Sequence, residues 1–284
     1  LRTLAHAIYL KVYMKSDTPH LSKESEFFHS VARAVIDHVD DRRSTNNGVV
    51  KRKHSETDYA TELDLSVEEL IVTQLNDLFP QDNILAEEMF TDTVVTDKRA
   101  WIIDPICGTN NLGRGIDAFC TNIALAENKK VIASCVIDHS EGEYYWSVGD
   151  KTIFKGRDVF TVPRQEKGVL IDVDLGCVDK APVDEQSRYP RIIQELITTP
   201  GYMLCSLNTS LGFAYIALGR MDGFLWMFIH PWDYCAGAFL IQEAGGIVTS
   251  TDGRPWEITD GEGLLAAMDP NVHESLLNAY KQSA

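Results

Sequence analysis

The sequence has no long apolar run, no paired cysteine motif and little positive charge. No stretch of about 18 consecutive apolar residues occurs, so we expect no membrane-spanning helix. The first residues also lack the pattern of a secretory signal peptide. With 26 lysines and arginines against 42 aspartates and glutamates, the formal net charge is −16. Such acidity argues against nucleic acid and anionic membranes as partners.

The cysteines form no Cys-x-x-Cys pair, which argues against a structural zinc site. They lie at Cys107, Cys120, Cys135, Cys177, Cys205 and Cys235, mostly among apolar neighbours. Scattered cysteines of this kind are typical of a reducing compartment, so we expect a cytoplasmic protein. The 284 residues, 44% of them hydrophobic, suffice for one large domain or two packed ones.

Residues 101–111 read Trp-Ile-Ile-Asp-Pro-Ile-Cys-Gly-Thr-Asn-Asn. The apolar start indicates a buried strand, and Pro105, which has no N–H group, is expected to end its ladder. Gly108 permits a positive φ or a close approach of the backbone to a ligand. Asp104 would therefore lie at the tip of a buried strand, before a turn rich in N–H groups. This arrangement suits a metal ion and a phosphate, although an ordinary Asp-Pro turn fits the same letters.

Other acidic residues also stand at the ends of expected elements. Asp64 precedes a helical pattern that runs to residue 79, and Glu87 lies at the end of a short strand expected at residues 84–88. Asp233 lies in the first turn of an apolar helix that starts at Pro231. A carboxylate at a helix start is favoured by the helix dipole alone, so none of these positions requires a metal.

The remaining pattern alternates strands and helices without internal repeats. Strands are expected at residues 120–126, 131–137, 169–173, 223–228, 247–250 and 264–267, with a hairpin at 144–148 and 152–154. Helices are expected from Ser22, at 189–197, at 204–218 and from Val272, and a short one within residues 1–18.

Four separated motifs resemble the inositol monophosphatase family of magnesium-dependent, lithium-sensitive sugar-phosphate phosphatases. They are Lys53 with Asp58–Asp64, Ala86-Glu87-Glu88, Trp101–Leu112 and Trp232–Gly246, and the resemblance covers residues 24–282. It implies an α/β fold, the layered αβαβα sandwich of the inositol monophosphatase and fructose-1,6-bisphosphatase type, and a homodimer. We expect an N-terminal extension (1–20), an α+β part with most metal ligands (21–160) and an α/β part that completes the active site (161–284).

The resemblance also implies the site and its chemistry, a phosphomonoester hydrolase for a small inositol- or sugar-type phosphate. It assigns metal binding to Glu87, Asp104, the carbonyl of Ile106, Cys107 and Asp233. Thr109 and Asp64 would orient the attacking water, with Glu87 close by. Gly108 and Thr109 would bind the phosphate, and further substrate contacts would come from Asn110, Asn208, Thr209 and Trp226. The implied cofactor is Mg²⁺, with Mn²⁺ or Zn²⁺ as alternatives, because two hard cations can stabilise both oxygens of an in-line displacement.

Two departures from the family pattern leave alternatives open. Cys107 replaces an aspartate, which removes a hard oxygen ligand, and thiolates suit Zn²⁺ better than Mg²⁺. The chain is then a slow enzyme with a weak second metal, an enzyme with another metal, a redox-sensitive enzyme, or a non-catalytic relative that binds a phosphorylated ligand. Trp226 replaces an acid that contacts a substrate hydroxyl in inositol-specific members, which weakens the case for inositol phosphate itself.

Overall fold

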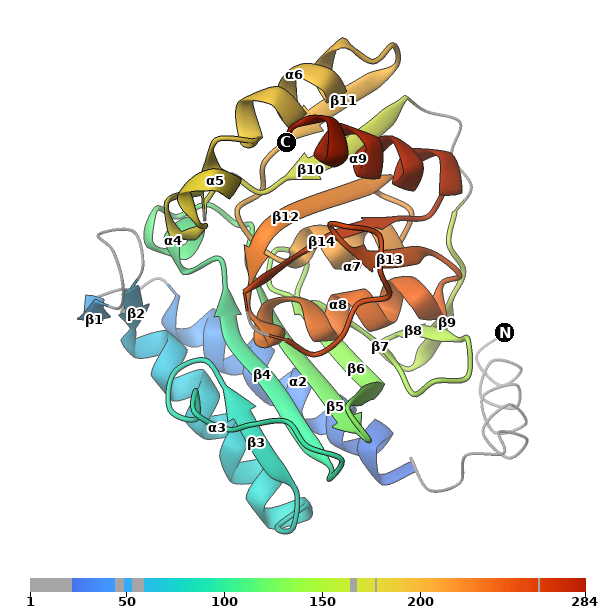
Figure 1. The fold of residues 1–284 in the computed structure, drawn as a ribbon. Helices are drawn as coiled ribbons and strands as arrows, with labels where there is room; N and C mark the ends of the chain where they lie inside the picture. The colour runs from blue at the N-terminus through green and yellow to red at the C-terminus, as the bar shows by residue number, and fades with distance from the viewer. Residues whose placement is uncertain (1–21, 44–48, 53–58, 164–167, 177, 260) are drawn as a thin grey trace.

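The computed structural model describes residues 22–43, 49–52, 59–163, 168–176, 178–259 and 261–284. The expected N-terminal extension with its short helix, Lys53 and Cys177 lie outside these residues. Within them, a helix pair, a seven-stranded sheet, a second helix pair, a five-stranded sheet and a third helix pair are stacked in this order (Figure 1). The expected αβαβα sandwich is thereby confirmed.

The first layer consists of α2 (Ser22–Arg42) and α3 (Glu62–Leu78), each with apolar residues at helical spacing. The rings of Phe27 and Phe28 in α2 pack edge-on against Trp101, with centroids 5.0 and 6.0 Å apart. All three rings are buried, and burial of each stabilises the fold by about 1.5–3 kcal/mol. This layer therefore anchors the strand that contains Trp101.

The first sheet has the order β3-β4-β5-β6-β7-β8-β9 and is antiparallel except for the pair β3–β4. Its strands are β3 (Asn83–Ala86), β4 (Ala100–Cys107), β5 (Cys120–Glu127), β6 (Lys130–Asp138), β7 (Glu143–Ser147), β8 (Ile153–Lys155) and β9 (Asp158–Phe160). The hairpin and strands expected between residues 120 and 154 are confirmed. A separate ribbon pairs β1 (Val49–Arg52) with β2 (Tyr59–Thr61), and the short α4 (Thr109–Gly113) follows β4.

Strand β4 passes through Pro105, so the expectation that this proline ends the ladder is wrong. The pairing with β5 shifts by one residue between Asp104 and Cys107 and resumes with Cys107 opposite Cys120. A bulge tolerates proline because its extra residue needs no ladder hydrogen bond. The extra residue also changes the alternation of side chains, so that Asp104 and Cys107 can face the same site.

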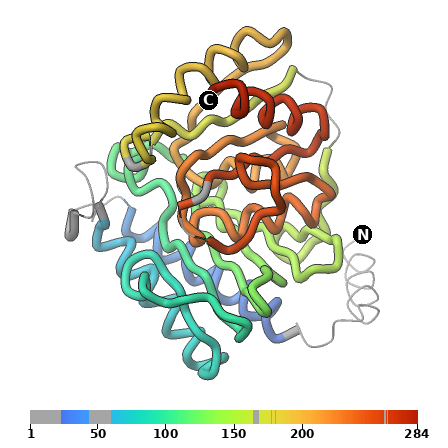
Figure 2. Tube along the Cα trace, in the orientation of Figure 1, coloured from blue at the N-terminus to red at the C-terminus, as the bar shows by residue number. Residues whose placement is uncertain are grey.

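The second sheet has the order β11-β10-β12-β14-β13, and β10 is parallel to both β11 and β12. Its strands are β10 (Val169–Val173), β11 (Tyr202–Cys205), β12 (Gly223–Ile229), β13 (Ile247–Ser250) and β14 (Glu262–Ala267). Between the sheets lie α7 (Leu211–Ala217) and α8 (Pro231–Glu243), which are mostly apolar because both sheets bury them. Figure 2 shows the blue-to-green half of the chain on one side and the yellow-to-red half on the other.

The prediction of a helix at residues 204–218 is wrong in its first half. Strand β11 pairs in parallel with β10, and α7 begins only at Leu211. Asn208 has a φ of +52°, which interrupts a right-handed helix, and the Leu207 N–H donates to the Asp172 carboxylate at 3.1 Å. Pairing within the sheet therefore overrides the local helical pattern.

The outer layer, α6 (Tyr189–Thr198) and α9 (Pro270–Gln282), covers the second sheet. Two short turns of helix, η2 (Val178–Lys180) and α5 (Val183–Gln186), precede α6. Helix α9 starts two residues before the expected position because Asp269 accepts a hydrogen bond from the Asn271 N–H at 2.7 Å. No helix in the described ranges is long and apolar enough to cross a membrane.

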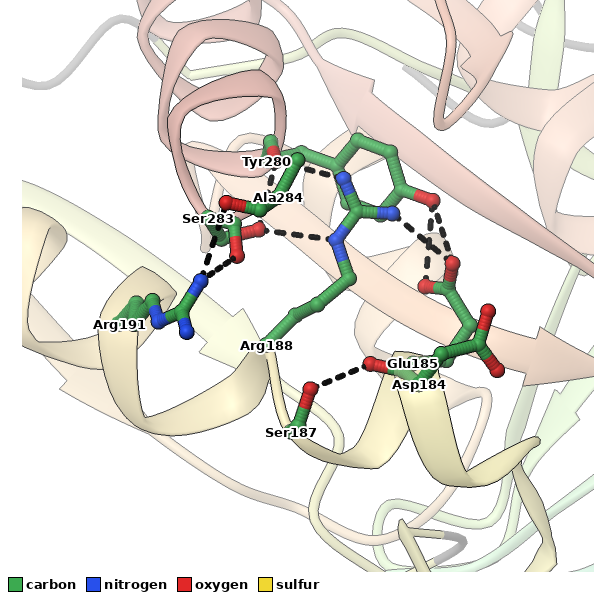
Figure 3. Close-up of polar contacts among 8 residues, drawn as sticks. All are labelled: Asp184, Glu185, Ser187, Arg188, Arg191, Tyr280, Ser283 and Ala284. Carbon is green, nitrogen blue, oxygen red and sulfur yellow. Dashed lines mark hydrogen bonds and ion pairs between the residues drawn. The ribbon is translucent and has the colours of Figure 1, made fainter.

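Arg188 joins α5, α6 and α9 at this outer face (Figure 3). Its guanidinium donates to Glu185 Oε1 at 2.8 Å, to Ser283 Oγ at 3.1 Å and to the Tyr280 carbonyl at 3.1 Å. It also lies 3.8 Å from the centre of the Tyr280 ring. Because the arginine is half-buried, these charge-assisted bonds are protected from water.

We expect Arg188→Ala to lower the free energy of unfolding by about 1–3 kcal/mol, since three acceptors each lose one charged donor. Urea unfolding monitored by circular dichroism measures this. Arg188→Lys is the matched control, because it keeps the charge beside Glu185 but cannot reach all three acceptors, and it should recover part of the loss. Equal urea midpoints for Arg188→Ala and the unmodified protein would contradict the role of this residue.

Candidate active site

Three side chains converge at the end of β4: Asp104 and Cys107 of this strand and Asp233 of α8. One ligand atom from each lies within 4.8 Å of the other two. In the described part of the chain, no second group of three His, Cys, Asp or Glu side chains is drawn together in this way. The bulge in β4 and the first turn of α8 thus meet at one point.

Asp104 is fully buried, and neither of its carboxylate oxygens has a hydrogen-bond partner. Burial first, and then the charges of Cys107, Glu87 and Asp233, raise the pKa of Asp104 well above its usual range. A buried carboxylate without hydrogen-bond donors remains ionised only where a cation compensates its lost hydration. The two unpaired oxygens therefore fit a divalent cation.

Asp233 is held by the start of its own helix. It is the third residue of α8, and its Oδ2 accepts a hydrogen bond from the His230 N–H at 3.0 Å. The other oxygen, Oδ1, lies 3.7 Å from Cys107 Sγ. One oxygen therefore caps the helix while the other faces the converging group, so the helix start fixes the direction of the ligand.

Asp64 has the same position in α3 and the same division of labour. Its Oδ2 accepts hydrogen bonds from the Thr61 N–H at 2.9 Å and from the Thr61 hydroxyl. Its Oδ1 accepts from the Thr109 hydroxyl at 2.8 Å, and that hydroxyl also lies 3.0 Å from the Ile106 carbonyl. Burial raises the pKa of Asp64 to about 6, although the hydrogen bonds from Thr61 and Thr109 act in the opposite direction.

Glu87 follows β3, which ends two residues earlier than the expected 84–88. Beyond the effect of burial, the charge of Glu87 raises the pKa of both Asp64 and Asp104, so Glu87 faces the same site. The turn that carries it is fixed by Glu68 of α3, whose carboxylate oxygens accept the N–H groups of Glu88 and Met89, both at 2.8 Å. Glu68 thus positions Glu87 without belonging to the converging group.

Gly108 joins β4 to α4 and has a φ of +103°. A Cβ atom there would lie 2.9 Å from the Ala118 carbonyl and 3.1 Å from Thr209 Cβ. Both the backbone conformation and the close approach therefore require glycine.

Two hydrogen bonds hold Cys107. The buried Thr209 donates its hydroxyl to the Cys107 carbonyl at 2.8 Å, and the Ser210 N–H donates to Cys107 Sγ at 3.1 Å.

The remaining expected substrate residues lie at different depths. Asn110 and the exposed Asn208 line one open cleft of about 600 Å³ beside α4, together with Arg114 and Gln186. Trp226 lies in β12 with only 3% of its surface exposed, and its ring packs against Phe224 with centroids 5.8 Å apart. Its indole N–H has no hydrogen-bond partner. The structure thus brings Asn110 and Asn208 to a cleft, while Trp226 belongs to the core.

The model of the inositol monophosphatase family matches residues 20–284. The chain belongs to this family. Inositol monophosphatase 2 of tomato (Solanum lycopersicum) is 30% identical over 250 residues, which cover 84% of this chain and 92% of the relative. The inositol-1-monophosphatase of Bacillus subtilis is 27% identical over 81% of this chain and 86% of its own. Another relative is named Nus factor SuhB, of Salmonella typhimurium, with 28% identity over 82% and 86%.

Solved members of the inositol monophosphatase family share the fold. The enzyme of Thermotoga maritima superposes with a TM-score of 0.76 at 25% identity, covering 92% of this chain and 97% of that one. An inositol monophosphatase/NADP phosphatase complexed with Mg²⁺ and phosphate gives a TM-score of 0.78 at 19% identity, over 92% and 95%. The resemblance inferred from the four motifs is confirmed.

Sequence reasoning missed three polar residues that support the site in this family member. Glu68 lies four residues after Asp64, so a helical projection would have placed both acids on one face of α3. Asn122 donates to Ser210 Oγ at 2.7 Å and to the Asp233 carbonyl at 3.4 Å. No local signal marks Asn122 and Ser210, because their contact joins residues that are 88 positions apart.

The raised pKa of Asp64 predicts a stability difference that depends on pH in the metal-free protein. Its folded pKa is about 6, whereas an unfolded aspartate has a pKa of about 3.9. The contribution of Asp64 relative to Asp64→Asn is therefore present at low pH and is lost as pH rises through about 6. We expect the difference in unfolding free energy to change by roughly 2–3 kcal/mol across this window, measured by urea unfolding.

Asp252→Asn provides a control of opposite sign. The Ser250 hydroxyl, followed by Arg254, lowers the pKa of the exposed Asp252, so its contribution is lost as pH falls. A pH-independent difference for Asp64→Asn would contradict the buried environment of Asp64.

Proposed function

We propose that the protein is a metal-dependent phosphomonoester hydrolase acting on a small polyhydroxylated phosphate of the inositol or sugar type. The convergence of Asp104, Cys107 and Asp233 around two unpaired, buried carboxylate oxygens carries this proposal. Membership of the inositol monophosphatase family supports it, because several relatives are named for that activity. A cytoplasmic location, expected from the scattered cysteines, and a homodimer, implied by the resemblance, stay predictions.

Mg²⁺ is the proposed cofactor, with Mn²⁺ or Zn²⁺ as alternatives. Glu87, Asp104 and the Ile106 carbonyl would hold a first ion, and an oxygen-only ligand set suits Mg²⁺. Asp104, Cys107 and Asp233 would hold a second. Bound divalent ions stabilise charge on phosphoryl oxygens and lower the pKa of bound water.

The side chains around the ligands would direct the attacking water and the phosphate. The Thr109 hydroxyl donates its hydrogen to Asp64, so the lone pairs of the Thr109 oxygen can accept a hydrogen bond from water. Thr109 and Asp64 therefore orient the water, with Glu87 close by. The N–H groups of Gly108 and Thr109 are proposed to bind the phosphate, because both belong to the turn between β4 and α4, directly after the ligand residue Cys107.

The cleft beside α4 supports a hydroxyl-rich substrate. Asn110, Asn208 and Gln186 present amide donors and acceptors there, which can bind sugar hydroxyls. Thr209, the residue after Asn208, is buried, and its hydroxyl donates to the Cys107 carbonyl. Because Trp226 is buried and carries no carboxylate, we propose a sugar-type phosphate ahead of inositol phosphate.

A second candidate function is a phosphate-ligand binding or regulatory protein. Two observations favour it: the thiol of Cys107 at a ligand position, and a relative whose name is that of a Nus factor. Such a protein would bind phosphate without releasing it from an ester. The two functions therefore differ in turnover.

Phosphate release from a panel of sugar and inositol phosphates, with Mg²⁺, Mn²⁺ or Zn²⁺ in turn, tests the proposal. We expect turnover by the unmodified chain and a loss of about 100-fold or more in kcat for Thr109→Val, because the water loses its orienting hydroxyl. Thr109→Ser is the matched control and should keep most activity.

Equal rates for Thr109→Val and Thr109→Ser would contradict the assigned role of Thr109. If neither the unmodified chain nor Cys107→Asp releases phosphate with any metal, the hydrolase proposal fails and the binding function takes its place.

A further inference from the structure

One of the three converging ligand atoms is sulfur. We propose that the cation position formed by Asp104, Cys107 and Asp233 selects a thiophilic divalent ion of the Zn²⁺ or Co²⁺ type over Mg²⁺. The inference deepens the proposed function at the same site, because it names the kind of ion at one of its two positions. It concerns a ligand set in which a thiol stands where the family pattern has a carboxylate.

The separation between the sulfur and one carboxylate oxygen suits a small tetrahedral ion. With Zn–S of about 2.3 Å and Zn–O of about 2.1 Å, a tetrahedral angle separates the sulfur and oxygen by roughly 3.6 Å. Cys107 Sγ and Asp233 Oδ1 are 3.7 Å apart. Asp104 supplies a third ligand from a fully buried carboxylate whose oxygens have no other partner. Three side-chain ligands would leave a fourth coordination position for water or substrate.

The sulfur itself disfavours Mg²⁺. That ion demands near-ideal octahedral oxygen coordination, whereas thiolates bind Zn²⁺ and Co²⁺ well. Replacing aspartate by cysteine therefore weakens the binding of Mg²⁺ and strengthens the binding of Zn²⁺ or Co²⁺ at the same position. The first position, with Glu87, Asp104 and the Ile106 carbonyl, contains only oxygen and keeps its preference for Mg²⁺.

Neighbouring groups hold the sulfur toward the carboxylates. The Ser210 N–H donates to Cys107 Sγ at 3.1 Å, and Asn122 in turn donates to Ser210 Oγ at 2.7 Å. A backbone donor directed at sulfur stabilises the thiolate that a metal ion requires. On binding, the Cys107 S–H bond breaks, the sulfur electron pair binds the ion, and the proton passes to solvent, so no oxidant or reductant is involved.

Cys120 offers a matched control on the neighbouring strand. It lies directly opposite Cys107 and is fully buried, and its thiol is 3.5 Å from Ser210 Oγ. Cys120 does not belong to the converging group of ligands. Cys107→Ser and Cys120→Ser therefore remove equivalent thiols from the same pair of strands, but only the first removes a ligand.

The experiment is a titration of the metal-free protein with Co²⁺ in the presence of excess Mg²⁺, followed by absorption spectroscopy. We expect one equivalent of Co²⁺ to produce a thiolate-to-cobalt charge-transfer band in the near ultraviolet, which Zn²⁺ then abolishes by displacement. Cys120→Ser should keep the band, and Cys107→Ser should lose it with Co²⁺ binding weakened on the order of 10–100-fold. Cys107→Asp should bind Mg²⁺ more tightly and Co²⁺ without the band.

A band that survives in Cys107→Ser, or its absence from both the unmodified protein and Cys120→Ser, would overturn the inference. Thermal unfolding of each variant checks its fold, and Cys107→Asp serves where Cys107→Ser does not fold. Phosphate release is measured on the same samples with Mg²⁺ and Co²⁺ together, and with Mg²⁺ and Zn²⁺ together, so that both cation positions can be filled. A Cys107-dependent band without turnover contradicts the proposed hydrolase but supports the metal preference. Turnover without the band supports the hydrolase but contradicts the metal preference.

Discussion

The burial of Asp104 without a hydrogen-bond donor is the constraint on which the site depends. Its burial and the neighbouring charges of Cys107, Glu87 and Asp233 all act in the same direction, against ionisation. Removing an ionised carboxylate from water costs several kcal/mol, and this cost is offset when a cation binds. The apolar layers around β4 therefore support a centre that is unfavourable by itself and favourable when an ion is bound.

The fold places its acids by repeating one device. Asp64 and Asp233 each occupy the third position of a helix, and each uses one oxygen to accept the N–H of the residue before the helix. The other oxygen is then directed at the site. The bulge in β4 adds Asp104 and Cys107 from the opposite direction, so two helix starts and one irregular strand converge. The device costs little, because a carboxylate at a helix start is already favourable.

The parts of this arrangement that depend on local chemistry were predictable from the sequence. The positions of Asp64, Glu87 and Asp233 at the ends of expected helices and strands identified them as candidate site residues. The linear motifs led to the family and to its αβαβα sandwich fold. Features set by contacts between distant segments were not: pairing in the sheet turned the start of the helix expected at residues 204–218 into β11, and the register of β4 against β5 carried the ladder past Pro105. The division of the chain at residues 160 and 161 and the assigned roles of the site residues stay predictions.

The most direct test of the central claim compares the unmodified protein with Asp104→Asn in urea unfolding at neutral pH, with and without divalent ions. The substitution keeps the shape of the side chain and removes its charge. Without metal, we expect Asp104→Asn to be at least as stable as the unmodified protein, because an uncompensated buried charge is gone. With metal present, we expect Asp104→Asn to be the less stable of the two, because the stabilisation from metal binding is lost. The same order of stability under both conditions would contradict a cation centre at Asp104.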